Sequence, residues 1–238
     1  MSIKIIAGYQ FIKLFYLDQM RGQLFDLCKM LDLQGTILLS EEGLNVNLAG
    51  IENRIDQFIM RLKNEFSFLA IPFNESLDEK KPFKKLKVKI KKEIIALRQS
   101  HIQPEKIRAP LMAPTHLKRW LDEGKPCTLL DMRNRYEVEF GTFKDAIHLD
   151  LKHFNELPKR IHILPKNQPI ITFCTSGIRC EKGALYLLEH GFKNVFQLQG
   201  GILNYFTEVG SDFYQNTCFV FDDRIAIDSQ LKPLSKND

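Results

Sequence analysis

One stretch, residues 170–182, constrains the fold of this chain more than any other. It reads Ile-Ile-Thr-Phe-Cys-Thr-Ser-Gly-Ile-Arg-Cys-Glu-Lys. A continuous apolar run ends at Cys174, a short loop leads to Arg179, and a helical pattern follows. Uninterrupted apolar runs of this kind are typical of central strands in parallel sheets. We therefore expect a strand–loop–helix unit inside a parallel α/β domain, with Cys174 at the carboxyl end of its strand.

The remainder of the second half alternates between strand and helix patterns, which supports the same fold class. The helix after Arg179 should end at Gly191, because glycine is common just beyond helix C-termini. The other elements that we expect here are a helix from Pro114, strands at 127–133 and 195–198, a loop over 141–147 that enters a short strand, and a helix at 202–209 after Gly200-Gly201.

Ligands bind to such domains outside the carboxyl ends of the strands. Asp131 and Arg133 follow one expected strand and Cys174 follows another, so these side chains should share one crevice. We expect Asp131 and Arg133 to support the site rather than to react. Tyr136 and Glu137 are candidates for its rim.

The loop after the central strand predicts a reactive thiol. Four residues, Thr175, Ser176, Gly177 and Ile178, separate Cys174 from Arg179. A tight loop of this length turns several N–H groups inward, and the helix N-terminus adds partial positive charge. Both effects lower the pKa of a thiol and favour the nucleophilic thiolate. Arg179 has two roles open to it, holding the loop or binding an anionic substrate.

The other cysteines carry weaker signals. Cys180 either resolves an oxidised or persulfidated Cys174, or packs inward as the start of the helix. Cys28 shares a helical face with Leu24 and Leu31, which predicts a core position. An odd number of cysteines without a secretory signal indicates the reducing cytoplasm. The histidines form no ligand pattern, so no metal site is expected.

The first half has its own pattern of elements. Its length, within a chain of 238 residues, is sufficient for a separate domain. The order β-α-β-β-α-β predicts a ferredoxin-like arrangement. The expected strands are residues 9–16, 35–40, 46–49 and 83–95, with helices after the first and third.

A dense run of lysines closes the first half. Residues 80–92 contain eight lysines and no acidic residue, within a chain of net charge +5. Lysines alternate with aliphatic residues in the last expected strand, so they should share one face. This face is either a solvated or edge-strand surface, or a surface that follows nucleic-acid phosphates. The candidate RNA-binding lysines are Lys84, Lys85, Lys87, Lys89 and Lys91.

The expected organisation therefore has four parts. Residues 1–98 form the ferredoxin-like domain, 99–113 a linker or an arm on the next domain, 114–210 the parallel α/β domain, and 211–238 a C-terminal extension. Apolar content of 44% and charged content of 26% are normal for a globular protein. No apolar run approaches the roughly 20 residues that span a membrane, so no membrane association is expected.

The second domain resembles a rhodanese domain. The resemblance rests on Asp131-Met-Arg133, Gly141 with Ala146-Ile147, Cys174 with Arg179, and Gly200-Gly201-Ile202. In rhodaneses the loop cysteine carries sulfur as a persulfide, and that residue would here be Cys174. The related dual-specificity phosphatases place five residues between cysteine and arginine. The four in this chain favour sulfur over phosphate chemistry.

Nearly the whole chain resembles the bacterial oxygen-dependent tRNA uridine hydroxylases, which convert wobble uridine 34 to 5-hydroxyuridine. The motifs are Glu42-Gly-Leu-Asn45, Phe83-Lys-Lys-Leu-Lys-Val-Lys89, residues 131–137 and residues 174–182. Members commonly have glycine at the position of Ser176. The resemblance implies tRNA as partner, molecular oxygen as co-substrate, a catalytic Cys174 and no evident further cofactor. A sulfurtransferase with a Cys174 persulfide and a non-catalytic anion-binding module remain alternatives, and the oligomeric state stays open.

Overall fold

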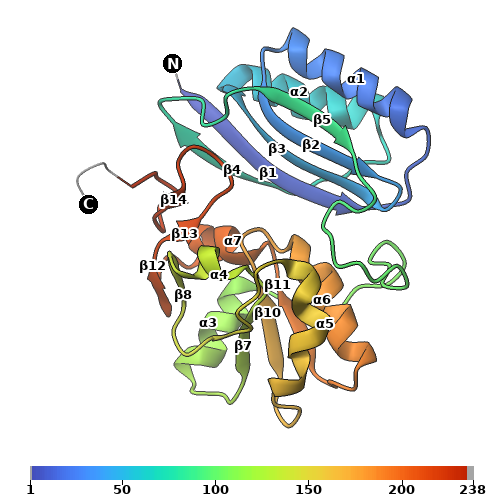
Figure 1. Ribbon diagram of the computed structural model, residues 1–238. Coiled ribbons are helices and arrows are strands. Elements are labelled where there is room, and N and C mark those ends of the chain that lie inside the picture. Colours follow the sequence, from blue (N-terminus) through green and yellow to red (C-terminus); the bar gives the residue numbers. More distant parts are fainter. Residues whose placement is uncertain (1, 235–238) are drawn as a thin grey trace. The chain divides into compact units, whose positions relative to one another are not determined.

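The computed structural model describes residues 2–234 and divides the chain into two compact units (Figure 1). The first unit runs to Ile94 and includes the short segment Asp222–Arg224. The second comprises Ile95–Phe221 and the chain from Ile225 onward. Each unit has its own sheet and its own hydrophobic core.

The first unit is a five-stranded sheet with two helices on one face (Figure 1). The strand order is β4-β1-β3-β2-β5, in which β4-β1-β3-β2 is antiparallel and β5 is parallel to β2. The expected ferredoxin-like fold is thus confirmed, with one strand added at the edge. Its elements are β1 (Ile3–Phe11), α1 (Leu17–Met30), β2 (Gln34–Ser40), β3 (Gly43–Ile51), α2 (Glu52–Glu65), β4 (Phe73–Asp78) and β5 (Leu86–Ile90).

The prediction of the first strand was wrong in its position. We expected residues 9–16, but β1 begins and ends earlier, at Ile3 and Phe11. Phe15 and Tyr16 lie in the loop before α1 and are exposed by 66% and 83%. Tyr16 is the N-cap residue of α1 and has a left-handed φ of 52°, a conformation that β-strand residues do not adopt.

The last strand of the expected pattern also differs. The strand that completes the ferredoxin-like order is β4, a polar edge strand that the sequence pattern did not reveal. The lysine-rich stretch expected as one strand over 83–95 is β5, only five residues long, and it is an additional strand beside β2. Leu86 and Val88 pack against the helical core, so the alternating lysines face away from the helices.

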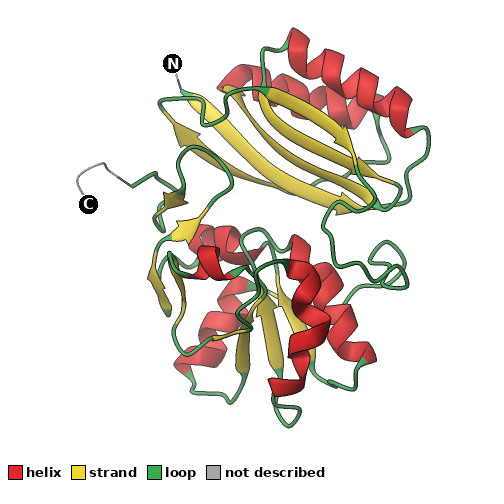
Figure 2. Cartoon of the chain, in the orientation of Figure 1, coloured by secondary structure: helices red, strands yellow, loops and turns green. Residues whose placement is uncertain are grey.

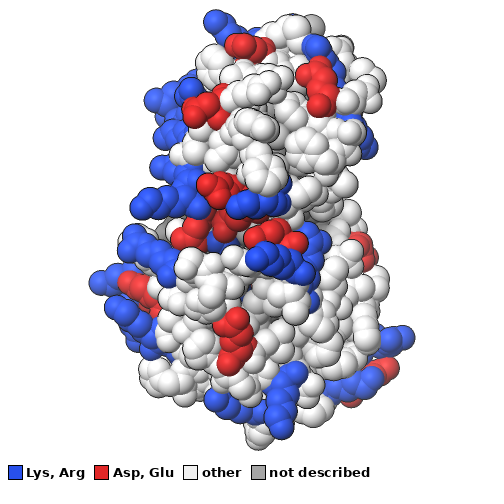
Figure 3. Space-filling view, turned by 90° about the vertical axis from the view of Figure 1, so that its right-hand side faces the viewer, with Lys and Arg blue, Asp and Glu red and all other residues white. Residues whose placement is uncertain are grey.

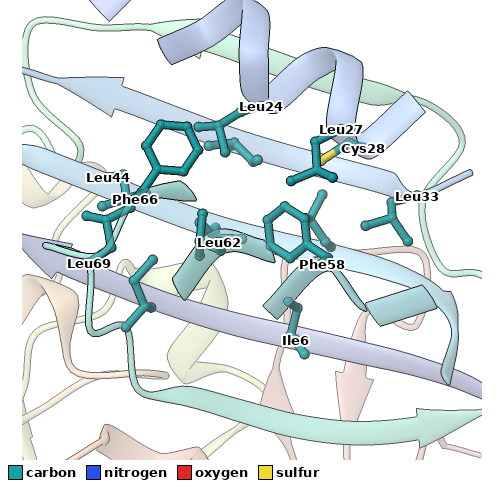
Figure 4. Close-up of a cluster of buried hydrophobic side chains, with 14 of the residues drawn as sticks. Ile6, Leu24, Leu27, Cys28, Leu33, Leu44, Phe58, Leu62, Phe66 and Leu69 are labelled. Carbon is teal, nitrogen blue, oxygen red and sulfur yellow. The ribbon is translucent and has the colours of Figure 1, made fainter. Parts of the chain in front are cut away.

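The core of the first unit lies between the sheet and its two helices (Figure 4). Leu24 and Cys28 of α1 and Phe58 of α2 have no exposed surface. The predicted core position of Cys28 is confirmed. Burial raises the pKa of its thiol to about 12, which leaves it a protonated packing residue.

The second unit has a parallel five-stranded sheet with helices on both faces (Figure 2). The strand order is β6-β11-β10-β7-β9, with β10 in the centre and every pairing parallel. The predicted parallel α/β fold is confirmed. The strands of this sheet are β6 (Leu111–Met112), β7 (Thr128–Asp131), β9 (Ile147–His148), β10 (Ile170–Phe173) and β11 (Val195–Leu198).

Two hydrophobic clusters cover the two faces of this sheet. One contains residues of α5 (Leu157–Arg160) and α6 (Ile178–Glu189), and the other contains residues of α3 (Pro114–Asp122) and α7 (Gly201–Glu208). Ile170 and Cys174 contribute to the first cluster, and Ile171 and Phe173 to the second. The remaining elements are α4 (Arg135–Val138), β8 (Gly141–Phe143), β12 (Tyr214–Asn216), β13 (Cys218–Phe219), β14 (Ala226–Ile227) and 3-10 turns at Phe154–Glu156 and Ile161–Ile163.

The segment expected to be a linker or an arm is packed against the second unit. Its strand β6 forms parallel pairs with β11 at the edge of the sheet. Leu97, Ile102 and Ala109 are buried in the cluster that contains α6. This segment is therefore an arm that contributes a strand and core residues.

The exposed surface is of mixed charge. On the face drawn in Figure 3, Lys and Arg side chains are interspersed with Asp and Glu. Between residues 2 and 234, no helix has both the length and the apolar character needed to cross a membrane.

Candidate active site

The candidate active site is built on the cysteine loop, residues 174–179, which joins β10 to α6. β10 ends at Phe173, and Cys174 follows it with no exposed surface. Gly177 is the N-cap residue of α6 and has a left-handed φ of 97°. Glycine adopts this conformation without steric cost, so the chain can turn from strand to helix within a few residues.

The N-terminus of α7 holds the loop from behind. The N–H groups of Ile202 and Leu203 donate to the carbonyl oxygens of Cys174 and Thr175, at 2.9 and 3.0 Å. Gly201 makes this approach possible, since a Cβ there would lie 2.4 Å from the Cys174 carbonyl oxygen. With its carbonyls bound on this side, the loop turns N–H groups toward the sulfur. The Gly177 N–H lies 3.2 Å from Cys174 Sγ.

The surroundings of Cys174 favour its thiolate. Burial raises the pKa of the thiol, because it disfavours the charged form. The Cys180 thiol, the charge of Arg179 and the backbone N–H groups of Arg179 and Gly177 stabilise the anion, and together they outweigh burial. The pKa of Cys174 falls to about 6. A thiol with this pKa is mostly thiolate at neutral pH, which is the reactive form of cysteine.

Cys180 lies in the first turn of α6 and is fully buried in the same cluster as Cys174. Burial and the hydrogen bond with Cys174 raise the pKa of Cys180 well above its usual value. It therefore remains a thiol and donates its hydrogen to the Cys174 thiolate. The interpretation of Cys180 as an inward-packing residue describes its place in the fold, and its resolving role stays a prediction.

Arg179 holds the loop to α4 through a buried ion pair. Its two terminal nitrogens donate to the two carboxylate oxygens of Glu137, at 2.6 and 2.7 Å. Glu137 also accepts a hydrogen bond from the backbone N–H of Asn134. Burial disfavours the charged guanidinium, but the Glu137 carboxylate outweighs it and raises the pKa of Arg179. Of the two roles considered for Arg179, its terminal nitrogens serve the first.

Asp131 and Arg133 form a second buried ion pair at the end of β7. The Arg133 guanidinium donates to both Asp131 carboxylate oxygens, and both side chains have no exposed surface. Arg133 also donates to the carbonyl oxygen of Gly141 at 2.6 Å, and the Thr142 hydroxyl donates to Asp131 at 2.8 Å. The pair ties β7 to the start of β8, which is a supporting position.

Ser176 occupies its place in the loop without backbone strain. It is half-buried and does not have the positive φ of its neighbour Gly177. A glycine is therefore not required at this position in this chain. Ile178 starts α6 and is buried, so it packs rather than faces a substrate.

The candidate RNA-binding lysines belong to the first unit, whereas the cysteine loop belongs to the second. Lys87 and Lys89 stand opposite Thr36 and Leu38 on the sheet face that lacks helices. All five candidate lysines are exposed, namely Lys84, Lys85, Lys87, Lys89 and Lys91.

Sequence reasoning missed two neighbours of the loop. Thr172 hydrogen-bonds to Cys180. The only sequence signal for this neighbour was its position two residues before Cys174. Phe221 lies with its ring centre 5.9 Å from the Arg179 guanidinium carbon, although 42 residues separate them in the chain. Residues 2–234 contain no group of three or more His, Cys, Asp or Glu side chains that could hold a metal.

Comparisons with known proteins match the two halves of the chain to two family models. Residues 3–94 match the family model described as UPF0176 acylphosphatase like domain, and residues 113–208 match the Rhodanese-like domain. A tRNA uridine(34) hydroxylase of Cupriavidus necator is 43% identical over 98% of this chain and 86% of its own length. The enzyme of the same name from Bordetella petrii is 41% identical over 96% of this chain and 94% of its own length.

The chain belongs to the tRNA uridine(34) hydroxylase family. The predicted resemblance and its two-domain fold class are thereby confirmed. Among solved structures, a rhodanese-related protein of Thermoplasma volcanium matches 42% of this family member and 94% of its own chain. Its sequence identity is 24% and its TM-score is 0.38.

Proposed function

We propose that this chain hydroxylates uridine 34 of tRNA, with molecular oxygen as co-substrate and Cys174 as the catalytic residue. One observation carries the proposal. A chain with 43% identity to a tRNA uridine(34) hydroxylase over nearly its whole length has a buried loop cysteine with a pKa of about 6. A merely structural cysteine would have its pKa raised by burial, as Cys28 and Cys218 do.

The role proposed for Cys174 is nucleophilic. A thiolate can add to C6 of uracil and place electron density on C5, the atom that receives the hydroxyl group. Loss of the C5 proton then breaks the C6–S bond, which restores the C5–C6 double bond and releases the thiolate. The loop supports such a step because Arg179 and the backbone N–H groups keep the sulfur anionic before substrate arrives. The buried Arg179–Glu137 pair keeps that positive charge in position.

The proposed partner is tRNA, and the proposed compartment is the cytoplasm. The five exposed lysines around β5 offer positive charge to the phosphates of tRNA. The described cysteines are free thiols, which fits the cytoplasm. Side chains of this kind bind the RNA backbone without reading its sequence. They would supply affinity, while the cysteine loop would supply the chemistry.

The test is nucleoside mass spectrometry of tRNA from cells that have no other route to 5-hydroxyuridine. Cells with the wild-type chain should contain the modified nucleoside, and cells with Cys174→Ala should lack it. Cys127→Ala is the matched control, because Cys127 is a half-buried thiol of the same unit with no place in the loop. Modification that persists in the Cys174→Ala strain would exclude the catalytic role.

One outcome would favour the alternative activity. The four-residue loop and the match to the Rhodanese-like domain also fit transfer of sulfur from a small donor through a Cys174 persulfide. The sulfurtransferase would be supported by two results together. The purified wild-type chain would transfer sulfur from thiosulfate, and cells that express it would keep their wobble uridines unmodified.

A further inference from the structure

A cluster of four aromatic rings lies beside the cysteine loop in the second unit. Phe219 is at its centre, with ring centres of Tyr136, Phe140 and Phe221 at 5.3, 5.4 and 5.1 Å. We call these four residues the aromatic rim. Two of its rings are open to solvent, since Tyr136 is 41% and Phe221 60% exposed. The two inner rings, Phe140 and Phe219, are half-buried, whereas packing within the protein leaves the outer two unexplained.

The aromatic rim and the cysteine loop share Arg179. The Phe221 ring stacks against the guanidinium, at 5.9 Å from the ring centre to Cζ. Tyr136 precedes Glu137, whose carboxylate binds the same guanidinium. An exposed aromatic surface therefore begins at the residue whose charge stabilises the Cys174 thiolate.

Two buried polar atoms of the cysteine loop have no hydrogen-bond partner among residues 2–234. They are the Thr175 hydroxyl oxygen and the Arg179 Nε. Both residues are more than nine-tenths buried, at 8% and 4% exposure. A buried polar group left unpaired is unfavourable, so a bound group that pairs with these atoms is stabilised by the hydrogen bonds it forms. A uracil ring offers two carbonyl acceptors and one N–H donor.

We propose that the aromatic rim, through Phe221 and Tyr136, is a stacking surface for the unpaired uracil that reacts at Cys174. The inference rests on the proposed function and names a subsite for its substrate. Proteins recognise single-stranded RNA loops by stacking splayed bases on aromatic side chains and Arg guanidinium planes. Here both kinds of group stand together at Phe221 and Arg179, and the cysteine loop to which Arg179 belongs carries the two unpaired polar atoms.

The rim is also oriented before a base arrives. The Tyr136 hydroxyl accepts a hydrogen bond from the Asn134 side chain at 3.3 Å. Phe219 contacts Tyr136, Phe140 and Phe221, so it fixes the spacing of the outer rings. A rigid aromatic surface loses little conformational freedom on binding.

The experiment measures binding of two anticodon stem–loop RNAs to the full chain by fluorescence anisotropy. One RNA has uridine at position 34 and the other has an abasic nucleotide there. Phe221→Ala should weaken binding of the uridine RNA about 5- to 150-fold, because stacking contributes about 1–3 kcal/mol per base. The abasic RNA should bind wild type and Phe221→Ala alike. Phe221→Tyr should bind the uridine RNA as wild type does.

Phe68→Ala is the matched control, since Phe68 is 50% exposed in the first unit and lies outside the rim. Equal binding of the uridine RNA by wild type and Phe221→Ala would overturn the stacking surface. An equal loss for both RNAs would also overturn it, because the ring would then not act on base 34. Failure of the proposed function is separate, as it appears as unmodified uridine 34 in cells with the wild-type chain.

Discussion

At the scale of single residues, the neighbouring sulfurs of Cys174 and Cys180 share one proton, which stays on Cys180. Cys180 and Cys174 are both buried, yet their pKa values move in opposite directions. Burial raises both pKa values, and the hydrogen bond then lowers that of Cys174 and raises that of Cys180. A buried cysteine can thus remain an anion because a second buried cysteine remains protonated.

Replacing Cys180 should therefore change the titration of Cys174. In wild type the thiolate absorbance at 240 nm, corrected with Cys174→Ser, should rise through about pH 6. Cys180→Ala removes the donor and should move the midpoint upward by about one to two pH units, since a hydrogen bond to a charged group contributes about 1.5–3 kcal/mol. Thiolate-dependent activity should then be lost on the acid side of neutrality. Cys180→Ser keeps a donor and should titrate near wild type, and an unchanged midpoint in Cys180→Ala would contradict the assignment.

At the scale of elements, the helix that follows β11 determines the shape of the loop that follows β10. The start of α7 donates to two loop carbonyls, and Gly201 permits the contact with a φ of 67°. A side chain at this position would meet backbone atoms that cannot rotate away. The loop conformation consequently depends on an element about 25 residues later in the chain.

Gly201→Ala should destabilise the protein by about 2–4 kcal/mol, because it combines a left-handed φ with a backbone clash. Gly124→Ala is the matched control, with a φ of 61° and no atom within 4 Å of the added Cβ. It should cost only about 1 kcal/mol. Urea unfolding of both variants measures the difference. Equal losses would mean that the clash with the loop is relieved elsewhere.

Elements with a strong local pattern could be predicted from the sequence, and those defined by distant partners could not. The buried face of α1 and the buried strand β10 could be predicted, because the spacing of apolar residues within each element indicates which of them are buried. Polar β4 was missed because its place is set by pairing with β1. The prediction of β1 was placed too late in the chain because Phe15 and Tyr16 have a high strand propensity. Both residues instead lie in the exposed loop before α1.

The same division holds for the candidate site. Cys174 and Arg179 were found because the loop is continuous in sequence. The partner of Arg179 is Glu137, which the sequence placed only at the edge of the site. The contact of Arg179 with Phe221 could not be foreseen. Contacts between residues about 40 positions apart depend on how the sheet is assembled.

At the scale of the whole molecule, we assign phosphate binding to the first unit, and base binding and chemistry to the second. The triple change of Lys85, Lys87 and Lys89 to Glu should weaken tRNA binding and flatten its dependence on salt. The slope of log K against log salt should fall by about 2–3, because each lost phosphate contact removes about 0.7–0.9. Anisotropy titrations at several salt concentrations measure it.

The control carries the same change of charge on the helices of the same unit, and it consists of Arg21, Lys29 and Lys63 changed to Glu. Binding by this variant should keep the wild-type salt slope. If both triple variants lose the same affinity, net charge rather than the β5 surface governs binding. If neither does, the lysines of β5 are a solvated surface.

The arm that carries β6 decides how this protein can be divided for study. A fragment that begins at Pro114 would lack β6 and the buried Leu97, Ile102 and Ala109. Its sheet would end at β11 with unpaired backbone groups, and open edges of this kind pair with other copies and aggregate. A fragment of the second unit should therefore begin at Ile95, so that the reactive loop is examined on a sheet whose edge is closed.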